Sequence, residues 1–138
     1  LYGKIYEIPH LKDHIDKCVE NGVYDPAVND KFTVGEINEL EKYLDHDRDY
    51  LFTYAGLRQV ADKYLVQDRS SGQVYETPQF MYMLIAMTMF AEYDRGTRLN
   101  YIKRYYDAIS KHKKSDYQQG NDDNPIFIHI CLHSQLLT

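Results

Sequence analysis

The chain has 138 residues, a length typical of one domain, which is enough to bury a core without disulfide bonds or a structural metal. Hydrophobic residues make up 43% of the sequence and charged residues 27%, as in ordinary soluble globular proteins. The net charge of −5 argues against a general affinity for nucleic acid or anionic membranes.

The two cysteines, Cys18 and Cys131, are too far apart to form a metal-binding pattern or a disulfide framework. We therefore expect a reduced, cytoplasmic chain. The first residues, LYGKIYEIPH, have no basic flank leading into an apolar run, so no signal peptide is predicted. Since the chain also lacks an initiator Met, we expect its first residue to lie within a longer sequence.

The first predicted helix covers residues 10–21, with Pro9 in its first turn and Gly22 as its C-terminal cap. Its apolar residues recur at helical spacing on one face. This pattern predicts that Cys18 is a small apolar group on the buried face and has no redox role. The residues of this face are Leu11, Ile15, Cys18 and Val19.

A second helix is predicted after Thr33, because TVGE has the capping-box pattern in which Thr33 and Glu36 satisfy each other's backbone amides. The helix continues through Ile37 and Leu40 to Leu44 and then meets the charged stretch DHDRDY.

Residues 51–64 predict a third helix, with Tyr54, Leu57, Ala61 and Tyr64 on its apolar face. Gly56 lies inside this pattern and costs roughly 1 kcal/mol relative to Ala, unless a neighbouring helix approaches there. Residues 64–76 predict a β-hairpin in which Gly72 supplies a positive φ.

Residues 77–91 predict a helix with Thr77 as N-cap and Pro78 at the first helical position. The helix is apolar nearly all round, so we expect it at the centre of the core. It is shorter than the roughly 20 residues of a membrane span. All four Met of the chain lie in it, and core packing explains them better than a binding surface does.

Residues 97–112 predict an amphipathic helix capped by Thr97, with Leu99, Ile102, Tyr106 and Ile109 on its apolar face. Residues 114–138 are polar and turn-rich at first and end in a short apolar run, so we expect a loop or disordered tail. The predicted fold is mainly α, a small orthogonal helical bundle with one short hairpin at about residues 64–76.

The stretch DHDRDY, residues 45–50, places three carboxylates and an imidazole within five residues. Asp45, His46, Asp47 and Asp49 are possible hard-metal ligands. However, the Gly and later Glu of a calcium loop are absent, no second His follows four residues on, and Arg48 would oppose a cation.

The alternative is a structural joint between two helices. One helix ends near Leu44 and the next begins near Thr53. Carboxylates near the start of the second helix would interact favourably with its dipole. Arg48 can then pair with a carboxylate across the joint. We favour the joint, because charge clusters more often organise structure than catalyse.

The motifs DRDYLFTY, KYLVQ and YETPQF, followed by TRLNYIKRYYDAISKHK, resemble the large (alpha) subunit of class I ribonucleotide reductase. The resemblance covers about residues 1–113 and corresponds to the all-helical region between the family's ATP-cone and its catalytic barrel. It implies a first domain at 1–113 and a tail at 114–138 that does not match the family.

The resemblance implies an oxidoreductase that converts ribonucleoside diphosphates to deoxyribonucleotides for DNA synthesis. It also implies ATP and deoxynucleotide effectors on the large subunit and a metal-radical centre on a small subunit. The expected partners are the remainder of the large subunit, including the barrel, and the small subunit. We expect no catalytic, cofactor-binding or metal-binding residue in this segment, and no nucleic-acid or membrane partner.

Three functions are weighed. The first is a helical scaffold of the reductase that is inactive without the barrel. The second is a truncated or frameshifted, non-catalytic helical module that binds a partner protein. The third, which we rank last, is an independent enzyme using His46 with Asp45 or Asp47, or His129 with Cys131. Helix faces that would normally pack on a barrel also predict self-association, which light scattering can detect.

Overall fold

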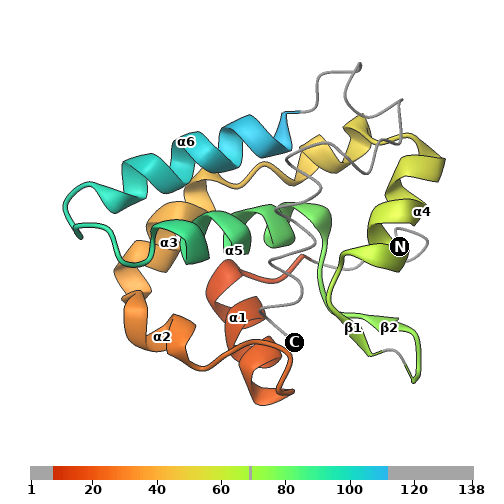
Figure 1. Cartoon of the computed structure of the whole chain (residues 1–138), viewed down its shortest axis with the longest axis horizontal. Helices are drawn as coiled ribbons and strands as arrows, with labels where there is room; N and C mark the ends of the chain where they lie inside the picture. The colour runs from red at the N-terminus through yellow and green to blue at the C-terminus, as the bar shows by residue number, and fades with distance from the viewer. Residues whose placement is uncertain (1–7, 69, 112–138) are drawn as a thin grey trace.

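The structure is a computed structural model that describes residues 8–68 and 70–111. These residues form six α-helices, one 3-10 helix and one antiparallel hairpin (Figure 1), which confirms the predicted mainly α fold with a short hairpin. In the described residues, no helix is both long and apolar enough to cross a membrane. The predicted tail at 114–138, with His129 and Cys131, lies outside the described residues. The elements in chain order are α1 Leu11–Glu20, α2 Ala27–Lys31, α3 Val34–Tyr43, η1 His46–Leu51, α4 Tyr54–Lys63, β1 Gln67–Asp68, β2 Gln73–Val74, α5 Pro78–Phe90 and α6 Arg98–Ser110.

The first two predicted helices are present, but Pro9 lies before the N-cap His10 of α1 and not in its first turn, and the short helix α2 between them was not predicted. Gly22 follows α1 with a φ of 73°, a conformation that few other residues adopt easily. Cys18 is buried on the core face of α1, as expected. At the start of α3, Thr33 Oγ1 accepts from the Glu36 amide and Glu36 Oε1 accepts from the Thr33 amide, both at 3.2 Å. The capping box is therefore confirmed.

Helix α4 differs from its prediction in which face is buried. It begins at Tyr54, after Thr53 caps the Gly56 amide at 3.1 Å. Tyr54 was expected on the core face but is 81% exposed, because it lies in the first turn before the helix meets the core at Val60. The space beside Gly56 is taken by its own cap, since an added Cβ would lie 3.2 Å from Thr53 Oγ1. No neighbouring helix explains that glycine.

The hairpin is shorter than its sequence suggested. Gln67 pairs with Val74 and Asp68 with Gln73, and Gly72 has the expected positive φ of 74°. The preceding Leu65 and Val66 are buried, and the Val66 carbonyl accepts a further hydrogen bond from the Tyr75 amide at 2.8 Å, next to the paired residues.

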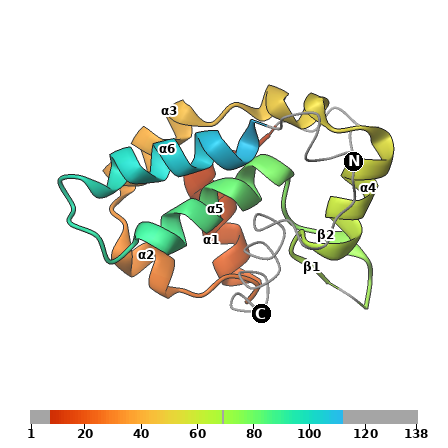
Figure 2. The same ribbon diagram turned by 45° about the horizontal axis from the view of Figure 1, so that its top comes forward.

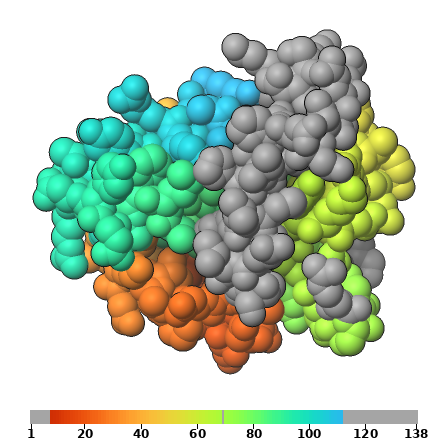
Figure 3. All heavy atoms as spheres, viewed as in Figure 1, coloured from red at the N-terminus to blue at the C-terminus, as the bar shows by residue number. Residues whose placement is uncertain are grey.

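Helix α5 is the centre of the molecule. Its N-cap Thr77 accepts from the Phe80 amide, and every residue from Pro78 to Met87 is buried, which confirms the predicted core helix. Helix α6 lies alongside α5 in both ribbon views, and α1 passes beneath α5 (Figures 1 and 2). In the space-filling view, the green and blue surface of α5 and α6 is continuous with the orange surface of the α1–α2 region (Figure 3).

Helix α6 is anchored at its N-terminal end by Arg98, which is 3% exposed. Its guanidinium donates to both carboxylate oxygens of Glu36 on α3, at 2.7 and 2.8 Å. It also donates to the carbonyls of Lys31 and Ala91, and it lies 4.3 Å from the ring centre of Phe32. Thr97, the predicted cap, accepts no hydrogen bond from the helix, and its hydroxyl donates to the Asp94 carbonyl instead.

Candidate functional site

The charged stretch 45–50 folds mostly as the 3-10 helix η1, which the sequence analysis did not predict. Asp45 caps it, because its Oδ1 accepts from the Asp47 amide at 3.1 Å and its carbonyl accepts from the Arg48 amide. A short polar segment capped by its own Asp gives no apolar period, so sequence periodicity could not reveal this helix. The idea that these carboxylates serve the dipole of α4 was wrong, since its first turn has no acidic residue.

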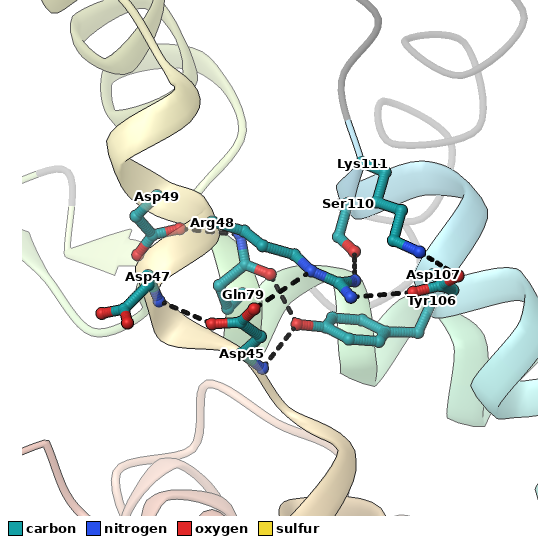
Figure 4. A network of polar contacts seen from close by, with 9 residues as sticks. All are labelled: Asp45, Asp47, Arg48, Asp49, Gln79, Tyr106, Asp107, Ser110 and Lys111. Atoms are coloured by element: carbon teal, nitrogen blue, oxygen red, sulfur yellow. Dashed lines mark hydrogen bonds and ion pairs between the residues drawn. The ribbon is translucent and has the colours of Figure 1, made fainter.

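Arg48 connects η1 to the C-terminal end of α6. Its guanidinium donates to Ser110 Oγ at 2.6 Å and to Asp107 Oδ1 at 2.8 Å, and its Nε lies 3.5 Å from Asp45 Oδ2 (Figure 4). The predicted pairing of Arg48 with a carboxylate across the joint is therefore confirmed. The hydrogen bond from Lys111, and then that from Arg48, hold the pKa of Asp107 below its usual value.

A second chain of hydrogen bonds, centred on Tyr106 and Gln79, lies beside Arg48. The Tyr106 hydroxyl donates to Gln79 Oε1 at 2.6 Å and accepts from the Asp45 amide at 3.0 Å. Gln79 Nε2 in turn donates to Asp49 Oδ1 at 2.9 Å (Figure 4). Burial raises the pKa of Tyr106, so its hydroxyl keeps its proton as the hydrogen-bond donor. These bonds join η1, α5 and α6 at one point.

Gln79 and Tyr106 are the joint residues that the sequence analysis missed. Both are fully buried, and Asp49 is 4% exposed. The available signal was Gln79 itself, because a lone amide in an apolar helix requires a hydrogen-bond partner when it is buried. The partner could not be named, since Asp49 is 30 residues away in the sequence.

The geometry of the four possible metal ligands can be compared directly. The described residues contain no group of three His, Cys, Asp or Glu side chains placed to hold a metal ion. Asp47 is exposed, and Asp49 is buried against Gln79. The four possible ligands therefore do not converge in the part of the chain that the structure describes.

Among the described residues, His46 contacts an aromatic ring, and its Nδ1 makes no hydrogen bond to Asp45 or Asp47. Its ring lies 4.8 Å from the ring of Phe80 in an edge contact, and burial lowers its pKa. His46 Nδ1 is the one buried side-chain nitrogen or oxygen of the described residues without a hydrogen-bond partner. Cys18 is also unsuited to nucleophilic chemistry, because burial raises the pKa of its thiol to about 12.

The comparisons with known proteins agree on one family. Residues 50–115 match the family described as "Ribonucleotide reductase, all-alpha domain". The chain is similar to ribonucleoside-diphosphate reductase 1 subunit alpha of Escherichia coli (strain K12), with 46% identity over 114 residues. The corresponding alpha subunits of Haemophilus influenzae and Enterobacteria phage T4 are 43% and 44% identical over 114 and 110 residues.

These alignments cover most of this chain and a small part of each relative. They include 83% of the chain for the E. coli and H. influenzae proteins and 80% for the phage protein. The chain spans about 15% of the length of these relatives. The aligned part therefore corresponds to one region of a much longer polypeptide.

Proposed function

Because the chain belongs to the ribonucleotide reductase large-subunit family through its all-alpha domain, we propose that it serves as the helical scaffold of a ribonucleoside-diphosphate reductase. The observation that carries the proposal is the 46% identity with an alpha subunit over 83% of the chain. In this proposal the reduction of ribonucleoside diphosphates takes place in the remainder of the large subunit.

The geometry supports a structural role for the segment. Helix α6 is held at one end by Arg98 and at the other by Arg48, so both ends of this helix are fixed to the rest of the described residues. The charged residues of DHDRDY contribute to these attachments through Arg48 and Asp49. A scaffold needs fixed helices more than it needs a reactive group.

The proposal assigns cofactors and partners to other polypeptide regions. We propose that nucleotide effectors bind elsewhere on the large subunit and that a separate small subunit holds the metal-radical centre. We also propose a cytoplasmic assembly that supplies precursors for DNA synthesis. None of these groups is assigned to a residue of this chain.

A chimera tests the scaffold role. In the E. coli alpha subunit, the residues that align with residues 8–111 of this chain are replaced by those residues, and reduction of a ribonucleoside diphosphate is measured with the E. coli small subunit present. We expect the chimera to fold and to retain reduction. The control is the E. coli subunit carrying the same junctions around its own segment. A folded chimera that assembles with its partner but has lost reduction would contradict the proposal.

A mixing experiment tests whether the chain completes a divided enzyme. The 138-residue chain is combined with a polypeptide that supplies the barrel of a related alpha subunit. If the scaffold acts in trans, reduction rises with the amount of added chain until the two polypeptides are equimolar. No increase at any ratio would count against a divided enzyme, and the chimera would still test the scaffold.

The second candidate is a non-catalytic module that binds a partner protein. It is favoured by the exposed apolar side chains of Tyr50, Leu51 and Tyr54, which are 74%, 58% and 81% exposed. In this case the chain should bind an intact alpha or small subunit, and a Leu51→Ser, Tyr54→Ser variant should bind more weakly. Absence of binding by the unaltered chain would remove this candidate.

A further inference from the structure

A second polar cluster lies in the core, between α1 and the segment that leads into α5. Its four members come from α1, from the loop that follows α1, and from the position before the N-cap of α5. Each is between 1% and 4% exposed, so water does not solvate the cluster. The members are His14, Cys18, Tyr24 and Glu76.

The cluster is a continuous chain of hydrogen bonds. The Val66 amide donates to Glu76 Oε1 at 2.7 Å, and the Tyr24 hydroxyl donates to Glu76 Oε2. His14 Nε2 lies 3.0 Å from the Tyr24 oxygen. Beyond the imidazole, Cys18 Sγ lies 3.8 and 3.9 Å from the two ring nitrogens. Each contact in the chain therefore joins two polar groups.

Among the described residues, no cation forms an ion pair with Glu76. Burial raises its pKa to about 7, against the opposing effect of the hydrogen bonds from Tyr24 and Val66. The carboxyl therefore gains or loses its proton near neutral pH. Burial lowers the pKa of His14 to about 4, so the imidazole is neutral over the same range.

The groups around the cluster explain why His14 does not take the proton itself. From α1, Lys17 lowers the pKa of His14, and His46 does the same from η1. His46 reaches it across Phe80, whose ring stacks on His14 at 4.1 Å. On the other side the ring meets the Tyr24 hydroxyl, which can either donate or accept a hydrogen bond.

We propose that Glu76, Tyr24 and His14 form a reversible hydrogen-bond relay, in which protonation of the Glu76 carboxyl reverses the Tyr24 hydroxyl and exchanges the tautomer of His14. When Glu76 is ionised, Tyr24 donates to the carboxylate, and His14 carries its proton on Nε2 and donates to the Tyr24 oxygen. This is the direction that satisfies both carboxylate oxygens as acceptors.

When Glu76 takes up one proton from solvent, the new carboxyl O–H donates to the Tyr24 oxygen. The Tyr24 hydroxyl then turns to donate to His14 Nε2, which must be unprotonated. By exchange with solvent, the imidazole releases its Nε2 proton and takes up one proton on Nδ1; Cys18 Sγ lies about equally far from the two nitrogens, 3.9 Å from Nδ1 and 3.8 Å from Nε2. The net change is a single proton on Glu76, and all three groups remain neutral and hydrogen-bonded.

The relay links the charge of one buried carboxyl to a helix on the opposite side of the cluster. Glu76 directly precedes the N-cap of α5, whereas His14 lies on α1. Reversal changes which ring nitrogen of His14 carries the proton, at the place where α1 packs against Phe80 of α5. The device therefore makes the contact between α1 and the start of α5 sensitive to pH near neutrality, independently of the proposed scaffold role.

Nuclear magnetic resonance of the unaltered 138-residue chain tests the relay. The chain is labelled with ¹⁵N-histidine and with ¹³C at the glutamate carboxyl carbon, and it is titrated between about pH 5.5 and 8.5. We expect the His14 protonated nitrogen to change from Nδ1 to Nε2 as the pH rises, with the midpoint of the Glu76 carboxyl titration. The proposal is overturned if His14 keeps one tautomer while Glu76 titrates, if Glu76 does not titrate in this range, or if His14 becomes an imidazolium.

Two variants sharpen the test. In Glu76→Gln the side chain is neutral at every pH and its amide N–H donates to Tyr24, so His14 should stay protonated on Nδ1 throughout. In Tyr24→Phe the link is cut, and the tautomer of His14 should no longer follow Glu76. The matched control is Glu92→Gln, because Glu92 is 81% exposed and distant from the relay, so His14 should titrate as in the unaltered chain. If circular dichroism shows that a variant does not fold, the titration of the unaltered chain decides the question.

Discussion

The two ends of helix α6 are held by the same kind of contact in different surroundings. At the N-terminal end, Arg98 and its partner Glu36 have side chains that are 3% and 14% exposed. At the C-terminal end, Arg48 and Asp107 are 15% and 28% exposed, and Lys111 shares the carboxylate from the solvent side. Both ends pair an arginine with a carboxylate, but the pair at the C-terminal end is more exposed to water.

This difference indicates how much each contact contributes to the free energy of unfolding. A buried ion pair leaves an uncompensated charge in the core when one partner is removed. A half-exposed pair leaves a charge that water can solvate. Arg98 also satisfies the carbonyls of Lys31 and Ala91, which lose their donor if it is replaced. The N-terminal end of α6 should therefore be the more sensitive of the two.

The largest expected effect is that of Arg98→Ala. The variant should lose about 3–5 kcal/mol of unfolding free energy, because the partly buried Glu36 and the carbonyls of Lys31 and Ala91 all lose their donor. That loss is a large part of the total stability of a domain of this size. Urea denaturation followed by circular dichroism measures it. The matched control is Arg95→Ala, an exposed arginine in the loop before α6, which should change stability by less than about 0.5 kcal/mol. Equal effects of the two changes would refute the comparison.

The next effect is that of Tyr106→Phe at the other end. Losing the hydroxyl leaves Gln79 Oε1 and the Asp45 amide without their partner, at a cost of about 1–3 kcal/mol. Thermal and urea unfolding both report it. Tyr101→Phe, on the same helix but 43% exposed, is the matched control and should be nearly silent. If Tyr106→Phe did not change the free energy of unfolding, the hydrogen bonds of Tyr106 would not stabilise the joint.

The pH dependence of stability tests the contribution of Glu36 at the N-terminal end of α6. The hydrogen bonds from Arg98 hold the pKa of Glu36 below its usual value of 4.5, so the folded state binds fewer protons there than the unfolded state. The stabilisation is complete above that pH and is lost as the pH falls through the lowered pKa. Urea titrations at about pH 5 and pH 3 should show a smaller loss for Glu36→Gln than for the unaltered chain. An equal loss would show that this pair does not respond to acid.

The smallest expected effect is that of Asp47→Ala. Asp47 is exposed, and only its backbone amide takes part in the cap of η1. Stability should change by less than about 0.5 kcal/mol, and metal content measured by elemental analysis should not change. A loss of bound metal or of any activity in this variant would revive the interpretation of DHDRDY as a chemical site.

The sequence predicted those parts of the fold that depend on local signals. The capping box at Thr33, the glycine turns at Gly22 and Gly72, and the apolar core helix were all found, because each is determined by neighbouring residues. Family resemblance identified the domain for a different reason, since long runs of identical residues are specific.

The remaining features depend on contacts between distant residues. Asp45 and Tyr106 are 61 residues apart, and Arg98 and Glu36 are 62 apart, so no periodicity relates them. Tyr54 shows the limit of periodicity, since it has core spacing and is exposed. The sequence predicted that Arg48 pairs with a carboxylate at the joint. Only the structure identified the residues of α5 and α6 that take part.

The most direct test of the account is a double-mutant cycle between Arg48 and Asp107. Unfolding free energies are measured for the unaltered chain, Arg48→Ala, Asp107→Ala and the double variant. If DHDRDY is a joint across to α6, the single changes should not add, and the coupling energy should be about 0.5–1 kcal/mol, as expected for a partly exposed pair. Additive changes with no coupling would show that Arg48 does not connect η1 to α6 and would contradict the account.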